Sequence, residues 1–522
     1  MISTPSRLED RNHSFQSIIT LEEHNSQREK FTAQLRKTKR LENANKRRDI
    51  MSESEGEAHY SDSLLAAIPQ LSNPYLDSRE KLESFYYLIS TTQSDEIRYS
   101  ALNSVRRLLS QSSAIPIKQA AEIGYIQLLI FYLNPQNRIE IQLEASWCLC
   151  NLAASDNGIV EKLVNSGAVQ ACLDVLNKEN QEVAEHAIWC IGNIAGDYHA
   201  HFRQQMIDSG IIGILINFLE EKDRLTREVM RTGAWTLHNL VRKRVVIPED
   251  TCKALLIFLK NWLDECEPAI KIDCLWAVAF LAEGGEKQIQ LVIDSQILKR
   301  VTKYAKMHTG KFKEPILRIF GNILTGNSQQ EQVLLNLKIL DILHETLQSK
   351  SAKIKKDALW SLSNLAASSR AQISKIVEHP VIKKAMRFLI DPNLMIRKEA
   401  CFIFVNIVRL GMYSSILSLL DSEILVILKE SLDTLDPEIL KLILEIAKGL
   451  LRAGSQNISS DGNNKVSRMY EDAGILDIIQ DIRINNANEK IQEAAETIIK
   501  QFFSTEQNEI VPLMTPDSYE FS

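Results

Sequence analysis

A short pattern that recurs about every 42 residues constrains the fold of this chain more than any other feature. In each clear copy a tryptophan is followed four residues later by an asparagine, among apolar residues at helical spacing. The three clearest copies are Trp147 with Asn151, Trp189 with Asn193, and Trp235 with Asn239. Because positions i and i+4 lie above one another on a helix, each copy presents an indole and a carboxamide on one face.

The pattern continues in weaker form toward the C-terminus. Its further copies are Trp276 with Phe280, Arg318 with Asn322, Trp360 with Asn364, and Phe402 with Asn406. Successive first positions lie 41 to 46 residues apart, and a helical period near forty is typical of HEAT and armadillo repeats. Glycines that follow amphipathic helices, such as Gly210 and Gly474, mark one corner of a repeat. We therefore predict an all-α, superhelical armadillo-type solenoid, in which each repeat packs only on its neighbours.

The charge of the chain is divided unevenly along its length. The 522 residues carry a net charge of −6, but residues 1–50 hold 11 Lys and Arg against 7 Asp and Glu, which gives +4. The remaining residues therefore carry −10. A basic arm on an acidic body indicates either an intramolecular contact or an acidic groove that receives a basic partner.

Several classes of protein are disfavoured by the composition. The eight cysteines have no zinc-site spacing and no secretory leader precedes them, so we expect reduced core residues in a cytosolic or nuclear protein. No apolar run is long enough for a membrane span. We find no phosphate-binding glycine loop, metal-ligand cluster or nucleophile motif, so we expect neither an enzyme nor a cofactor. An acidic solenoid is also a poor candidate for direct nucleic-acid binding.

Basic residues gather before the repeats begin. Residues 28–41 lack glycine and proline and predict a helix, but their thin apolar face would not fold alone. Along the whole chain we expect a basic, largely disordered arm at residues 1–55, an acidic linker at 56–79, about ten repeats over 80–505, and a disordered tail at 506–522.

Two interpretations of the tryptophan and asparagine pairs are open. A periodic tryptophan is usually a core residue, and a periodic asparagine is often a polar group between helices. However, an exposed asparagine offers a donor and an acceptor to a peptide backbone, and indole faces attract Lys and Arg side chains. Acidic residues also fall on the same face, namely Glu144, Asp197, Asp273, Asp357 and Glu399. We therefore expect a groove that binds extended basic peptides.

These features resemble the importin-α (karyopherin-α) family of nuclear import adaptors over about residues 28–505. The most specific stretches are WCIGNIAGD at 189–197, WTLHNL at 235–240 and RIFGNILTG at 318–326, together with LRKTKR at 35–40. The resemblance implies that the chain binds basic nuclear-localisation-signal peptides of cargo proteins and links them to importin-β. It also implies shuttling between cytoplasm and nucleus, and recycling by an export receptor that binds at about residues 470–503.

The resemblance assigns site residues in four groups. The major peptide site would consist of Trp147, Asn151, Trp189, Asn193, Asp197, Trp235, Asn239 and Asp273. The minor peptide site would consist of Arg318, Asn322, Thr325, Trp360, Asn364, Glu399 and Asn406. The importin-β-binding arm would use Arg28, Arg36, Lys37, Lys39 and Arg40, and the autoinhibitory cluster that imitates cargo would be Lys46, Arg47 and Arg48.

Some positions depart from the family pattern. Val160 and Ser155 stand where the family has Thr and Gly near the major site, and Glu506 and Glu509 are all that remains of its C-terminal acidic cluster. Phe402 and Phe280 replace larger or more polar aromatic residues, and phenylalanine has a weaker cation–π face than tryptophan. We therefore expect a weak minor site.

A catenin-like armadillo scaffold is the alternative function. Such a scaffold would need a basic groove for acidic partners, whereas acidic residues flank these tryptophans. It would also have no use for the basic residues at 28–48. His186 and His238, which lie beside the pattern, are expected to be structural or to line the groove.

Overall fold

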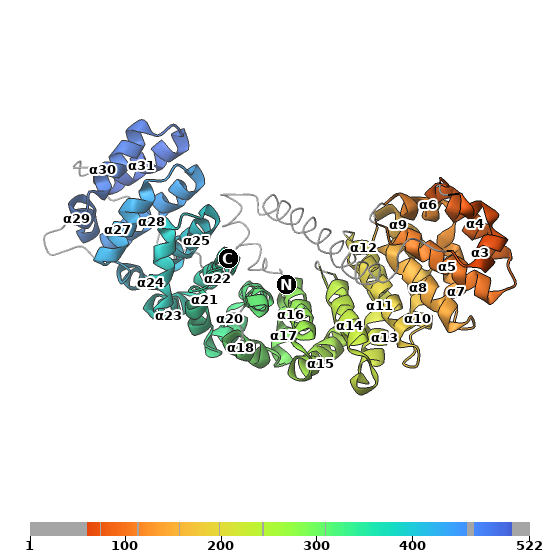
Figure 1. Cartoon of the computed structure of the whole chain (residues 1–522). Coiled ribbons are helices and arrows are strands. Elements are labelled where there is room, and N and C mark those ends of the chain that lie inside the picture. The colour runs from red at the N-terminus through yellow and green to blue at the C-terminus, as the bar shows by residue number, and fades with distance from the viewer. Residues whose placement is uncertain are drawn as a thin grey trace, which may run out of the picture. The chain divides into compact units, whose positions relative to one another are not determined.

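The computed structural model describes residues 60–503, apart from residues 74, 112–113, 156, 198, 243–244, 308–309 and 457–463. Every regular element in this part of the chain is an α-helix or a short 3₁₀ helix, which confirms the all-α prediction (Figure 1). None of the described helices combines the length and the apolarity that a membrane crossing requires.

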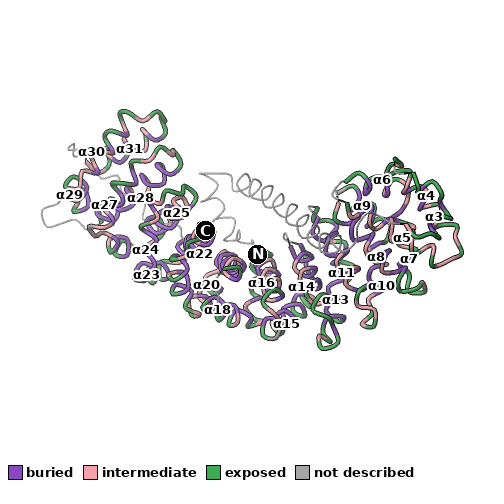
Figure 2. Tube along the Cα trace, viewed as in Figure 1, coloured by how far each residue is buried: buried purple, intermediate pink, exposed green. Residues whose placement is uncertain are grey.

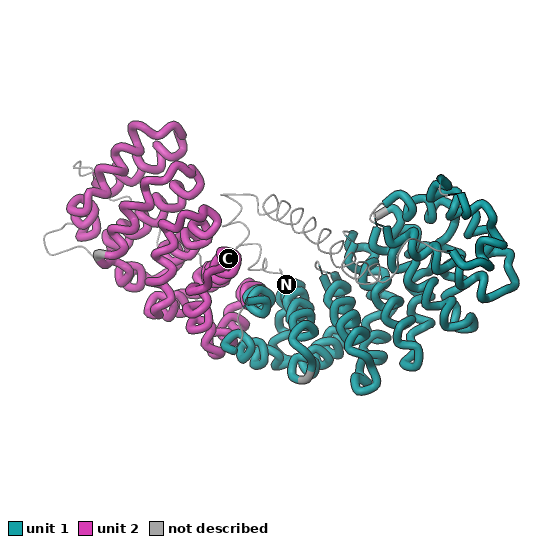
Figure 3. Tube along the Cα trace, viewed as in Figure 1, with its two compact units in different colours: residues 1–319 teal, residues 320–522 magenta. Residues whose placement is uncertain are grey.

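The described residues form two compact units, one ending at Ile319 and one beginning at Phe320 (Figure 3). The helices of the first unit, with α19 that runs into the second, are α3 (Asp62–Ala67), η1 (Pro69–Ser72), α4 (Ser78–Thr91), α5 (Asp95–Leu109), α6 (Ile115–Ile123), α7 (Tyr125–Leu133), α8 (Ile139–Ala153), α9 (Asn157–Asn165), α10 (Ala168–Asp174), α11 (Gln181–Ala195), α12 (Ala200–Asp208), α13 (Ile211–Leu219), η2 (Lys222–Arg224), α14 (Arg227–Leu240), α15 (Glu249–Glu265), α16 (Pro268–Leu281), η3 (Ala282–Gly284), α17 (Glu286–Asp294), α18 (Leu298–Met307), η4 (Gly310–Phe312) and α19 (Lys313–Ile323). The remaining helices of the second unit are α20 (Ser328–Asn336), α21 (Ile339–Thr346), α22 (Ala352–Ala366), α23 (Arg370–Glu378), α24 (Val381–Met386), η5 (Arg387–Ile390), α25 (Leu394–Leu410), α26 (Tyr413–Leu417), α27 (Ser422–Leu432), α28 (Pro437–Ser455), α29 (Lys465–Asp472), α30 (Ile475–Asn485) and α31 (Glu489–Phe502).

The helices come in groups, in which shorter helices precede a long one. A residue with positive φ joins the two shorter helices of several groups. It is a glycine at four corners, namely Gly124, Gly167, Gly210 and Gly474. Glycine lacks the Cβ that makes this backbone conformation costly, so the predicted corner role of Gly210 and Gly474 is confirmed. At two further corners Gln296 (φ 59°) and Lys338 (φ 60°) adopt the same conformation.

The long helices form a row within each unit. In the first unit α5, α8, α11, α14 and α16 pack on one another in chain order, and in the second unit α22, α25 and α28 do the same. We call the helices that carry the tryptophan and asparagine pattern the ladder helices. Most residues of α8 and α11 are buried (Figure 2), because each of these two helices is covered by a long helix on either side and by a shorter helix on another face.

The N-terminal end of the first unit differs from our expectation. Within the expected linker 56–79, residues 62–67 and 69–72 are helical, and Leu64, Ile68 and Leu71 are buried. Helix α3 contacts α5, and the Tyr60 ring lies 6.0 Å from that of Phe85. These apolar contacts fix the segment against the first repeats, so the expected linker was too wide.

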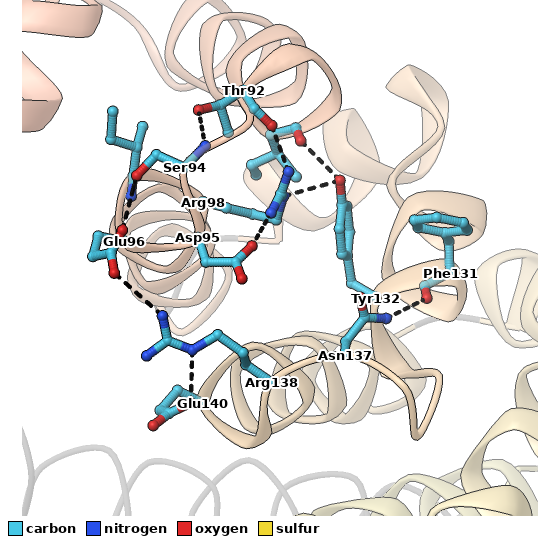
Figure 4. A network of polar contacts seen from close by, with 12 residues as sticks. Thr92, Ser94, Asp95, Glu96, Arg98, Phe131, Tyr132, Asn137, Arg138 and Glu140 are labelled. Atoms are coloured by element: carbon cyan, nitrogen blue, oxygen red, sulfur yellow. Dashed lines mark hydrogen bonds and ion pairs between the residues drawn. The ribbon is translucent and has the colours of Figure 1, made fainter.

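Polar contacts between neighbouring groups hold this end in register (Figure 4). Arg98 of α5 donates from Nε to the Tyr132 hydroxyl (3.1 Å), and that hydroxyl donates to the carbonyl of Ile89 on α4 (2.9 Å). Arg138, just before α8, pairs with Glu96 at the start of α5 (3.3 Å). Contacts between α4, α5, α7 and the start of α8 thus join neighbouring repeats.

Candidate functional site

The ladder helices bring the predicted tryptophans of the first unit into one row. Trp147 lies on α8, Trp189 on α11, Trp235 on α14 and Trp276 on α16, and these helices pack side by side (Figure 1). All four indoles are half-buried. A half-buried indole in a row of stacked helices can lie against a neighbouring helix on one side and still present an edge or face to a ligand.

The ladder asparagines join successive repeats through their side-chain amides. Nδ2 donates to a backbone carbonyl of the preceding ladder helix in each of four cases: Asn193 to Cys150 (3.2 Å), Asn239 to Gly192 (3.2 Å), Asn364 to Gly321 (3.1 Å) and Asn406 to Ser363 (3.0 Å). The acceptor is always the residue just before the previous asparagine. Asn151, at the start of the row, donates instead to Ser110 Oγ (3.1 Å).

This arrangement corrects our argument about the asparagines. We favoured asparagines that are exposed to a peptide backbone, yet the amide satisfies a carbonyl of the neighbouring helix, and Asn193 and Asn239 are only 5% and 3% exposed. The asparagine side chains therefore form hydrogen bonds that join neighbouring repeats. In the described part of the chain, Oδ1 of Asn193 and Asn239 accepts no hydrogen bond from the protein, so this acceptor remains for a ligand.

At Gly192 and Gly321, the residue before the ladder asparagine forms the floor under the next tryptophan. A Cβ at Gly192 would lie 2.3 Å from the Trp235 ring, and a Cβ at Gly321 would lie 1.9 Å from the Trp360 ring. A side chain at either position would push the indole out of its place. The glycines in the two stretches WCIGN and RIFGN are thus explained by the close approach of the next repeat's tryptophan.

Asp197 lies at the C-terminal end of α11 and is 6% exposed. Its Oδ1 accepts from the backbone N–H of His199 (2.8 Å) and lies 3.1 Å from His199 Nδ1. Its backbone carbonyl accepts from the guanidinium groups of the buried Arg203 (2.7 Å) and Arg242 (3.4 Å). These bonds hold the turn in one conformation, so the carboxylate is pre-organised beside the Trp189 and Trp235 helices.

The other acidic residues of this face are partly committed within the chain. Glu144 is buried and accepts from Arg106 Nε (2.7 Å) and Asn103 Nδ2 (2.8 Å), so its charge is already neutralised. Asp273 pairs with His238, with 3.1 Å between Oδ1 and Nδ1. Asp357 and Glu399 are each 8% exposed. Glu144, which we expected on the acidic face of the groove, is therefore already paired within the chain.

Sequence analysis did not predict that Arg106 stands at the start of the row. The Arg106 guanidinium carbon lies 4.3 Å from the centroid of the Trp147 ring, and His186 from the helix on the other side lies 4.6 Å from the same ring, centroid to centroid. Trp147 thus sits between two side chains of its own protein. Extending the period one step backward from Trp147 and Asn151 would have found Arg106 and Ser110 at the equivalent places.

The predicted minor-site residues fall mainly in the second unit. Asn322, Thr325, Trp360, Asn364, Glu399 and Asn406 all lie there, and the Thr325 hydroxyl donates to the carbonyl of Asn322 (2.7 Å). Arg318 belongs to the first unit and is half-buried on α19. The row ends at α28, where Glu445 and Gly449 stand at the equivalent places. Glu445 pairs with Arg409 (3.2 Å), and a Cβ at Gly449 would lie 2.4 Å from Val408.

The remaining predicted residues lie outside the described part of the chain. These are the importin-β-binding arm (Arg28, Arg36, Lys37, Lys39 and Arg40), the cluster Lys46, Arg47 and Arg48, and the tail residues Glu506 and Glu509.

The cysteines are all free thiols, and seven of the eight are buried. Burial raises the pKa of Cys252 to about 11 and that of Cys401 to about 12. Such thiols stay protonated at neutral pH, and a protonated thiol is a poor nucleophile. Cys266 is half-buried. The prediction that the cysteines are core residues is confirmed for the other seven.

Comparison with known proteins supports the fold and the relationship. The armadillo/β-catenin-like repeat family matches residues 156–196 and 327–367. Importin subunit alpha-1b of Oryza sativa subsp. japonica is 28% identical over 83% of this chain and 82% of its own length. Importin subunit alpha-1a of the same plant is 26% identical over 98% and 95%. This chain carries armadillo repeats, and its curated relatives are importin α subunits.

The solved structures bear on the fold. An engineered protein of known crystal structure aligns with 81% of this chain and 98% of its own length, with a TM-score of 0.69 and 20% identity. At this identity the likeness extends to the helical architecture and no further. It agrees with the predicted armadillo-type solenoid.

The first prediction concerns the structural role of the ladder asparagines. Asn239→Ala removes a buried amide and leaves the Gly192 carbonyl without its partner, which should lower the free energy of unfolding by about 1–2 kcal/mol. Urea denaturation followed by circular dichroism measures this change. Asn406→Ala is the matched control, because Asn406 makes the same bond from a half-buried position and should cost less. Unchanged stability in Asn239→Ala would contradict the proposed bond between repeats.

Proposed function

We propose that this chain is a nuclear import adaptor without catalytic activity, which binds the basic nuclear-localisation-signal peptides of cargo proteins along its ladder. The observation that carries the proposal is the geometry around Trp189 and Trp235. Two half-buried indoles on adjacent helices flank the side-chain-free floor at Gly192, beside the pre-organised carboxylate of Asp197. The relationship to importin α subunits supports the same function.

The chemistry of this region fits an extended basic peptide. A Lys or Arg stem between two indoles would bury its methylene groups and gain cation–π attraction. Asp197 would receive the charged head, and Oδ1 of Asn193 and Asn239 would accept from the peptide N–H groups. Adjacent helices lie about 10 Å apart and an extended chain advances about 3.3 Å per residue. A peptide would therefore meet one ladder helix about every three residues.

The rest of the adaptor cycle follows from the arm and the last helices. We propose that residues 28–40 form the importin-β-binding helix, and that Lys46, Arg47 and Arg48 occupy the ladder when importin-β is absent. The last helices, α29 to α31, would bind the export receptor that returns the adaptor to the cytoplasm. The −10 charge of residues 51–522 gives the basic arm an electrostatic reason to return to the body of the protein.

A second peptide site is proposed for the residues of the second unit. Trp360 packs on Gly321 as Trp235 packs on Gly192, but the next ladder helix carries Phe402 in place of a tryptophan. Phenylalanine offers a weaker face to a cation. We therefore propose that this site contributes less to peptide affinity than the site in the first unit.

Removal of the acidic group or of one indole tests the main site. Asp197→Asn and Trp189→Ala should each weaken binding of a fluorescent basic peptide by about tenfold or more, because each removes a direct partner of the cargo cation. Trp360→Ala is the matched control and should weaken a two-cluster peptide less than Trp189→Ala does. Fluorescence anisotropy at physiological salt measures all three. Wild-type affinity in Asp197→Asn would contradict a cargo lysine at this carboxylate, and equal losses in Trp189→Ala and Trp360→Ala would contradict the ranking of the two sites.

Removal of residues 1–55 tests autoinhibition separately. The truncated chain should bind the same peptide several-fold more tightly than the full chain, because the competing cluster at 46–48 is gone. Equal, tight binding by both chains would leave the peptide groove intact and refute autoinhibition. Failure of both chains to bind would refute the adaptor function and favour an armadillo scaffold with other partners.

A further inference from the structure

One ladder position in the first unit differs in kind from its equivalents. The residue just before the ladder asparagine, or before its substitute, forms the floor beneath the next aromatic residue. Where an aromatic residue follows in the next repeat, four of these positions hold a small side chain or none, namely Cys150, Gly192, Gly321 and Ser363, and the one that precedes Trp147 holds Leu109. The sixth is His238, which follows Trp235 on α14 and precedes Trp276 on α16. His238 is the one member of this set of six that carries an aromatic ring.

The imidazole of His238 is stacked against the aromatic side chains of the next ladder helix, α16. We call the binding position between the aromatic residues of two successive ladder helices a rung. The centroid of the imidazole ring lies 5.5 Å from that of Phe280, with 20° between the planes, and 6.4 Å from that of Trp276, with 18° between the planes. The Trp276 and Phe280 rings are also nearly parallel, at 6.0 Å and 27°. The three rings thus form one stack across α14 and α16. The imidazole thus takes up space beside the two rings that a cargo side chain would use at this rung.

The same histidine engages the acidic group of this rung. Nδ1 of His238 lies 3.1 Å from Oδ1 of Asp273, and the two side chains are 17% and 25% exposed. A neutral imidazole can donate this hydrogen bond, and a protonated imidazole would add a full positive charge. Asp197 has a similar partner in His199, at 3.1 Å, so the pairing alone does not set this rung apart; the imidazole beside the aromatic rings does. Phe280 also stands in place of the ladder asparagine, so the rung offers no side-chain amide to a peptide backbone.

We propose that His238 determines cargo specificity by closing the rung between Trp235 and Trp276 to Lys and Arg side chains. The inference rests on the proposed peptide-binding function and refines it. Cations are accepted between Trp189 and Trp235, where the floor is Gly192 and the anion is Asp197. Beyond Trp235 the imidazole lies beside the aromatic rings and pairs with Asp273. The basic stretch of cargo that binds to the first unit therefore ends at the position between Trp189 and Trp235.

The substitution His238→Ser opens the rung with a side chain that the ladder already uses at Ser363. The probe is a basic peptide of about ten residues, prepared as a series in which each position is in turn Lys or Ala. For the wild-type chain, we expect that positions beyond the main cluster discriminate between Lys and Ala by less than about twofold. In His238→Ser one further position should favour Lys by about fivefold or more, since Trp276 and Asp273 are then available. Fluorescence anisotropy competition measures the series.

Two further variants make the test specific. In the double variant His238→Ser with Asp273→Asn the new preference for Lys should disappear, because the carboxylate that receives the charge is lost. His379→Ser is the matched control: His379 and Asp341 form a pair with the same 3.1 Å separation in the second unit, away from the ladder. It should leave the peptide series unchanged. Circular dichroism melting of each variant verifies that it is folded.

The outcomes separate this inference from the proposed function. If the wild-type chain binds the series through Asp197 but His238→Ser gains no position that favours Lys, His238 does not close the rung and the inference is overturned. If the gain survives Asp273→Asn, the assignment of Asp273 as the acceptor is overturned. If neither the wild type nor His238→Ser binds any peptide of the series, the proposed function itself fails, and the inference fails with it.

Discussion

The hydrogen bond from four of the ladder asparagines to a carbonyl of the preceding ladder helix is the interaction on which the rest of the site depends. It recurs with the same donor atom and the same relative acceptor at Asn193, Asn239, Asn364 and Asn406. A buried amide can satisfy a carbonyl in this way at only one register of the two helices. Since the indole stands one helical turn before the asparagine, the register that the bond fixes also aligns the tryptophans. The proposed recognition surface is thus a by-product of how the repeats are joined.

The contacts that join the repeats also position the candidate site, which explains why the site is rigid. The floor glycines permit close approach of the next indole, and two buried arginines hold the backbone at Asp197. A pre-organised surface loses little entropy when an extended peptide binds. The arrangement also permits variation in specificity. A single floor residue, such as His238, changes which rungs can bind a cation and leaves the helices in place.

The sequence was sufficient to predict the architecture. The period near 42 residues and the glycine corners are local signals, and the observed helices and turns agree with them. The sequence also located the row of tryptophans on adjacent helices. What it could not reveal were the contacts between repeats, because they depend on which atoms meet across some forty residues. The bond of Asn239 to Gly192, the neutralisation of Glu144 by Arg106 and the stack of His238 on Phe280 all belong to this class. The basic arm, on which regulation is proposed to depend, lies outside the described residues.

The most direct test of the account is the response of the individual indoles to a basic peptide. The chain has six tryptophans, and their indole N–H signals can be followed by NMR and assigned by single Trp→Phe substitutions. The account predicts that the signals of Trp189 and Trp235 shift and saturate together as the peptide is added. Trp262, which is 3% exposed on α15, should not move. A peptide that binds while the Trp189 and Trp235 signals stay in place would show that recognition occurs elsewhere and would contradict the central claim.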